Sequence, residues 1–130
     1  MLNILLKEKK KFLILLIILL TFPAYAADWK LYFENQMGIK FFIDIDSIHQ
    51  TPEGTTLVWR RISPSDKADV KRTLEILYEI DCSRRRFKTL QGTVYDYNTN
   101  EIKPLEKSGW EYFEPDDLST ALYKVVCKTQ

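Results

Sequence analysis

Apolar and polar residues alternate along most of the chain after residue 28. Successive side chains of a strand point to opposite faces of a sheet, so this period of two predicts strands that are buried on one face. Glycine, proline and asparagine lie between the alternating runs, where they favour tight turns. The strands expected from this pattern are Trp29–Glu34, Lys40–Ile45, Thr55–Ile62, Thr73–Cys82, Arg85–Tyr97 and Glu101–Leu105.

Two shorter segments and one glycine complete this part of the pattern. Asp46–Gln50 follows the second strand and has the composition of a short helical turn, whereas Ser63–Lys71 combines Pro64 with alternating charges, which predicts an exposed loop or a short solvated helix. Gly92 interrupts the fifth strand and predicts a β-bulge there.

The period changes near the C-terminus. Leu118, Leu122 and Val125 recur at helical spacing, and Asp116 and Asp117 precede them as candidate N-caps. This spacing predicts a short amphipathic helix. We therefore expect the α+β class, with a single antiparallel sheet of about five to six strands and a C-terminal helix packed on it.

The N-terminus has the layout of a secretory signal peptide. Lys7–Lys11 is basic, Phe12–Phe22 is apolar, and Ala24-Tyr25-Ala26 fits a cleavage site. The alternative is a retained membrane anchor, but the apolar run is shorter than the roughly 20 residues that a spanning helix needs. We predict a signal peptide at 1–26 and a mature domain at 27–130, without a lipid anchor because no cysteine lies near the cleavage site.

Composition narrows the function classes. Residues 27–130 suffice for one domain and carry a formal charge of −2, a near balance that argues against a nucleic-acid binder. One histidine and two distant cysteines do not supply a zinc site, so no metal is expected. His49 lies close to Asp44 and Ser47, but these residues crowd one strand end without an oxyanion donor. We expect no enzymatic activity and no catalytic residues.

The two cysteines predict a disulfide, because an exported chain reaches an oxidising compartment. Cys82 shares the apolar face of its strand. Cys127 lies roughly opposite Leu118 around the helix, so pairing requires either that the helix frays before Cys127 or that it is buried nearly all round. We favour fraying. At this point the bond can lie within one chain or between two chains.

Several short motifs follow one another in an order that resembles a known family. The resemblance is to the surface-adhesin protein E family of small exported bacterial proteins, and it spans nearly the whole of residues 27–130. The motifs are Trp29–Tyr32, Phe41–Ile48, Val58–Arg60, Leu77–Arg84, Trp110 ahead of Pro115, and Leu122–Cys127.

This resemblance implies an antiparallel sheet to which the C-terminal helix is tethered by a Cys82–Cys127 disulfide. It also implies binding of host matrix or plasma proteins such as vitronectin and laminin, and it extends to haem. The expected location is outside the cytoplasm, either periplasmic or at the cell surface.

Two groups of residues are candidates for partner binding. Arg84, Arg85, Arg86 and Lys88 form the densest basic cluster, near a hairpin tip, although short charge runs are commonly just solvated surface. Aromatic residues fall on both faces of the predicted strands, more than one face can bury, so some of them offer a partner or homodimer surface. The aromatic candidates are Trp59, Tyr95 and Tyr97.

The leading functional prediction is thus an exported, adhesin-like binding protein that contacts host or extracellular matrix proteins and needs no cofactor. The alternative is a periplasmic accessory or small-ligand carrier. In that case haem is one candidate ligand, with His49, Met37 or a tyrosine as its axial ligand.

Overall fold

The computed structural model describes residues 2–20 and 27–128. The first helix, α1 (Leu2–Leu20), lies within the predicted signal peptide, and the predicted cleavage motif at 24–26 falls outside the described residues. Among the described residues, no helix combines the length and the apolar character that a membrane crossing requires.

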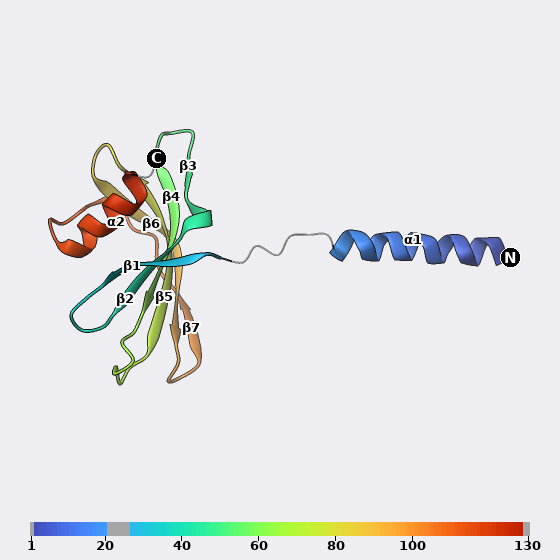
Figure 1. The fold of residues 1–130 in the computed structure, drawn as a ribbon, viewed down its shortest axis with the longest axis horizontal. Coiled ribbons are helices and arrows are strands. Elements are labelled where there is room, and N and C mark those ends of the chain that lie inside the picture. Colours follow the sequence, from blue (N-terminus) through green and yellow to red (C-terminus); the bar gives the residue numbers. More distant parts are fainter. Residues whose placement is uncertain (1, 21–26, 129–130) are drawn as a thin grey trace.

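An antiparallel sheet forms the body of the domain (Figure 1). Its main strands follow the order β1-β2-β4-β5-β6-β7, while the two-residue strands β3 and β8 pair with β4 and β6. The main strands lie in the sheet in the order in which they occur in the sequence, as short antiparallel connections allow. The predicted α+β class is confirmed. The strands are β1 (Trp29–Glu34), β2 (Lys40–Asp44), β3 (His49–Gln50), β4 (Thr56–Ser63), β5 (Arg72–Asp81), β6 (Arg86–Asp96), β7 (Glu101–Pro104) and β8 (Glu111–Tyr112).

β4 and β6 each pair along one edge with two short strands instead of one continuous strand. β2 pairs with the second half of β4 and β3 with its first half, and the 3-10 helix η1 (Ile45–Ser47) separates them. β7 and β8 share the outer edge of β6 in the same way. Because η1 turns the chain out of the sheet, Ile45 is 45% exposed and the second strand ends one residue earlier than its pattern predicts.

The core lies between one face of the sheet and α2 (Asp117–Cys127). Alternate side chains of β2, β4 and β5 point to this face, as their period of two predicts, and α2 lies against it (Figure 1). Burying such a side chain contributes roughly 1.5–3 kcal/mol. The fully packed members are Ile43, Val58, Ile76, Tyr78, Ile80, Leu122 and Val126.

The helix begins where the capping pattern places it. The side chain of Asp116 accepts a hydrogen bond of 2.7 Å from the backbone N–H of Ser119, which satisfies one of the free donors of the first turn. Leu122 and Val126, four residues apart, then lie on the same side of α2 and are buried. The predicted amphipathic helix is confirmed.

The Cys82–Cys127 disulfide forms within the chain, with a Cα–Cα distance of 5.7 Å. The expectation that the helix frays first is wrong, since Cys127 is still helical and the N–H of Lys128 bonds to the carbonyl of Lys124. The pairing works because Cys127 lies about 40° around the helix from Tyr123. The Tyr123 hydroxyl donates a 3.2 Å hydrogen bond to the carbonyl of Cys82, so this flank of α2 faces the end of β5.

Gly92 does not form the bulge that its position predicts. The register of β6 shifts two residues earlier, at Leu90, opposite Leu77 and Tyr78. At Gly92 an added Cβ would lie 2.8 Å from the carbonyl oxygen of Glu75 and 2.9 Å from Cδ1 of Leu105. The glycine therefore allows Leu105 to pack closely over the β5–β6 pair.

Removing the disulfide should destabilise the domain. The bridge spans 45 residues, and closing a loop of this length restricts the unfolded chain, which contributes about 3 to 4 kcal/mol. We expect a Cys82→Ser/Cys127→Ser variant to lose this free energy of unfolding in denaturant titrations, and the wild type in dithiothreitol to lose as much. A loss below about 1 kcal/mol in both would contradict the stabilising role.

Candidate functional site

The turn between β5 and β6 is organised by one buried carboxylate. Asp81 accepts hydrogen bonds from the Ser83 hydroxyl at 2.8 Å, from Nε of Arg86 at 3.1 Å and from the backbone N–H of Arg84 at 3.3 Å. Arg85 occupies the left-handed region, with φ at 51°. Asp81 therefore holds a tight turn in which two arginines, Arg84 and Arg85, project from the tip.

These hydrogen bonds also determine the acidity of Asp81. The bond from Ser83 has the largest effect, and together with Arg86 and the backbone N–H of Arg84 it holds the pKa of this carboxyl below its ordinary value, although burial acts in the opposite direction. The negative charge that organises the turn thus persists at moderately acidic pH.

Two members of the basic cluster are already engaged inside the domain. The Arg86 guanidinium lies 4.3 Å from the ring centre of Trp110, and Nζ of Lys88 lies 4.6 Å from it. Arg86 also pairs with Asp81, and Lys88 lies 3.5 Å from the Glu79 carboxylate. Because Arg86 and Lys88 stack on an indole and pair with carboxylates of β5, they are less available to bind a partner.

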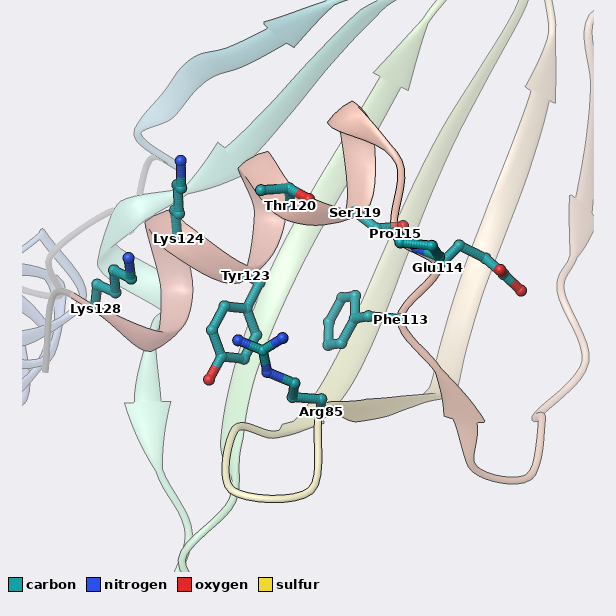
Figure 2. Close-up of a pocket in the computed structure, with 9 residues that line it drawn as sticks. All are labelled: Arg85, Phe113, Glu114, Pro115, Ser119, Thr120, Tyr123, Lys124 and Lys128. Atoms are coloured by element: carbon teal, nitrogen blue, oxygen red, sulfur yellow. The ribbon is translucent and has the colours of Figure 1, made fainter.

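Arg85 contributes to a different surface, a cleft between the turn and α2 (Figure 2). Its guanidinium lies 4.9 Å from the ring centre of Tyr123, and the rings of Tyr123 and Phe113 are 5.9 Å apart, edge to face. We call this the hairpin–helix cleft, with a volume of about 290 Å³. Its lining residues are Arg85, Phe113, Glu114, Pro115, Ser119, Thr120, Tyr123, Lys124 and Lys128.

The hairpin–helix cleft is predominantly positive. Lys124 lies in the last turn of α2 and Lys128 is the C-cap that follows it, where cations are also favoured by the helix dipole. Glu114, the acidic residue in the lining, points away from Arg85 in Figure 2. Three cations around an aromatic floor are suited to a carboxylate or sulfate next to an apolar group.

The aromatic candidates do not belong to the hairpin–helix cleft. Trp59 pairs with Leu77 and alternates with the buried Val58, so it lies half-buried on the sheet face opposite α2. Tyr95 and Tyr97, whose ring centres are 4.5 Å apart, line a shallow site of about 440 Å³ together with Arg61. The structure thus divides the predicted binding residues between two surfaces.

Sequence reasoning missed Phe113, Tyr123, Lys124 and Lys128. Phe113 follows a strand of only two residues, too short for a periodic signal. Tyr123 and Lys124 lie just beside the apolar stripe of the predicted helix, and Lys128 lies four residues after Lys124, on the same side of α2. This spacing was the available signal, but the contact with Arg85 spans nearly forty residues of sequence and no local pattern indicates it.

The polar residues around His49 serve the backbone. The carboxylate of Asp44 accepts hydrogen bonds from the N–H groups of Asp28 and Asp46, and the Ser47 hydroxyl bridges the Asp44 carbonyl and the Trp59 N–H. Asp46 takes part through its backbone N–H, so the side chains of Asp44 and Ser47 close this turn. In the part of the chain that the structure describes, no cluster of three metal-ligating side chains occurs.

The hydrogen bonds of Asp81 predict how stability depends on pH. Its pKa is lower in the folded state, so its contribution is complete above the unfolded-state pKa and is lost as pH falls toward the folded-state value. We expect Asp81→Asn to unfold more readily at pH 7 and to lose part of the fall in stability below about pH 4 that urea titrations should show for the wild type. Asp96, whose pKa Arg72 lowers, contributes a further part of that fall.

Asp66→Asn is the matched control, because Asp66 is exposed in the loop between β4 and β5, and this variant should behave as the wild type. Identical acid profiles for Asp81→Asn and Asp66→Asn would contradict this role of Asp81.

Comparison with known proteins gives one assignment. The family model described as surface-adhesin protein E matches residues 29–128, which begin at the first residue of β1 and end just after α2. No curated protein and no solved structure matches the chain. The match covers well over half of the chain and nearly all of the folded domain. The chain belongs to the surface-adhesin protein E family.

Proposed function

We propose that this chain is an exported, non-enzymatic binding protein that attaches to host or extracellular matrix proteins, such as vitronectin or laminin, through an acidic segment of the partner. Membership of the family suggests a surface adhesin and a role without catalysis. The single observation that supports this site is the hairpin–helix cleft, which Arg85, Lys124 and Lys128 line together with Phe113 and Tyr123.

The charges support the hairpin–helix cleft as the binding surface. Arg86 and Lys88 are paired with carboxylates of β5, whereas Arg84 and Arg85 form no ion pair among the described residues. A partner carboxylate that approaches Arg85 therefore meets a cation that stacks on Tyr123 but has no competing carboxylate among the described residues. The aromatic floor adds an apolar contact of the kind that dominates protein interfaces.

Export is part of the same proposal. Residues 1–26 are proposed to be a signal peptide that is removed, leaving 27–130 as the mature domain. The disulfide fits an oxidising compartment outside the cytoplasm, and the family match begins three residues after the proposed cleavage point.

A second function is favoured by an apolar groove at the end of the core face that α2 leaves uncovered. The groove has a volume of about 450 Å³, within the usual range for small-ligand sites. Met37, Ile62, Val70 and Leu74 line it, and Met37 is 72% exposed. A periplasmic carrier of an apolar ligand, haem included, would use this groove.

Charge reversal in the hairpin–helix cleft should abolish adhesion. We expect an Arg85→Glu/Lys124→Glu variant to bind immobilised vitronectin or laminin at least about tenfold more weakly than the wild type, and to show a weaker dependence on salt. Lys103→Glu/Lys107→Glu is the matched control, because it reverses two exposed lysines away from the cleft. An equal loss of affinity in both variants would contradict the assignment of the binding site to the cleft. If the wild type does not bind these proteins, the proposed function is wrong.

The carrier function predicts a different result. If haem occupies the groove, titration with haemin should give a stoichiometric shift of the Soret band that Met37→Leu abolishes and His49→Ala, on the distant strand β3, preserves. A shift that survives Met37→Leu, or no shift, would count against haem in this groove.

A further inference from the structure

Arg60 carries a positive charge into the core. It extends from β4 on the same face as the buried Val58, and only 8% of it is exposed. Its guanidinium lies 4.9 Å from the ring centre of Phe41 and 5.7 Å from that of Tyr78, so two aromatic rings flank it. These rings stabilise the cation in part but do not neutralise it.

No carboxylate accompanies this buried charge. In the described part of the chain, none of the ion pairs involves Arg60. The buried carboxylates Asp44 and Asp81 are occupied elsewhere, by backbone N–H groups near η1 and by the β5–β6 turn. An unpaired cation in a protein interior is costly, which makes a site of this kind a candidate for a ligand of opposite charge.

The neighbouring groups add donors rather than acceptors. Nη1 of Arg60 donates to the Tyr78 hydroxyl at 3.2 Å, which leaves the O–H of Tyr78 free to donate elsewhere. Nε of Arg60 and the hydroxyl of Tyr32 are both buried and have no hydrogen-bond partner among the described residues. The site therefore contains more hydrogen-bond donors than acceptors.

Tyr32 is close enough to feel the charge of Arg60. Burial raises the pKa of Tyr32 to about 12, and the positive charge of Arg60 opposes this rise without forming a hydrogen bond of good geometry with the hydroxyl. Tyr32 is therefore neutral at physiological pH, and its hydroxyl is available as a donor.

We propose that a small monovalent anion, such as chloride, binds between Nε of Arg60 and the hydroxyls of Tyr32 and Tyr78. The anion supplies the negative charge and the acceptor that this part of the core lacks. It connects β1, β4 and β5 on the face that α2 covers. A bound water would accept hydrogen bonds from the same groups but would leave the charge of Arg60 uncompensated.

The test measures thermal unfolding while sodium gluconate is replaced by sodium chloride or bromide at constant ionic strength. Because the anion binds the folded state, we expect the melting temperature of the wild type to rise by about 3 to 8 °C between about 1 and 200 mM halide. Arg60→Met should abolish the rise, and Tyr32→Phe, which removes one hydroxyl and keeps the ring, should reduce it.

Arg61→Met is the matched control. Arg61 is the next residue of β4, points to the other face and pairs with Glu75 at 2.6 Å, so its variant should keep the full response to halide. An equal response in all variants would overturn the proposal, as would a bromide-soaked crystal with an ordered water and no anomalous peak beside Nε of Arg60. If Arg60→Met fails to fold, the response of Tyr32→Phe to halide and the anomalous map test the proposal instead.

Discussion

The rest of the structure depends on the attachment of α2 to one face of the sheet. A helix of 11 residues is marginal by itself in water, so its stability has to come from packing. Both ends are fixed, since Asp116 caps the first turn and the disulfide joins Cys127 to the end of β5. Between these points Leu122 and Val126 complete the core. Without α2 this face of the sheet would expose its apolar side chains to water.

The opposite face has no such cover and is protected by its own side chains. The Arg61 guanidinium of β4 lies 4.2 Å from the ring centre of Trp29, two strands away on β1, and pairs with Glu75 on the neighbouring strand β5. Trp59 lies half-buried on the same face. Aromatic residues occur on both faces of the strands because one set fills the core and the other packs under charged side chains. The aromatic excess in the sequence thus reflects a two-sided sheet as much as a binding surface.

The sequence predicted the fold where periodicity extends over several residues. The long strands β4, β5 and β6 and the capped helix follow from local spacing, whereas the Cys82–Cys127 pairing within one chain was implied by the family resemblance. The bulge at Leu90 was missed because it depends on register with β5, and Gly92 was misread because its reason is the contact with Leu105. β3 and β8 contain two residues each, too few for any period. These misses all arise from contacts between strands.

The candidate site shows even more clearly the difference between what local sequence patterns predict and what contacts between strands determine. In sequence, Arg84, Arg85, Arg86 and Lys88 form one basic cluster, yet the antiparallel register places Arg86 opposite Asp81 and Lys88 opposite Glu79. Pairing across β5 and β6 therefore neutralises half of the cluster.

Lys124 and Lys128, at the C-terminal end of α2, line the same cleft as Arg85 and add positive charge to it, although no local sequence pattern relates them to the turn. The hairpin–helix cleft thus exists only while α2 is docked, and the bond that holds α2 in place, Cys82–Cys127, lies at the same end of the helix as these lysines. The disulfide that stabilises the domain therefore also holds the two sides of the candidate binding surface together.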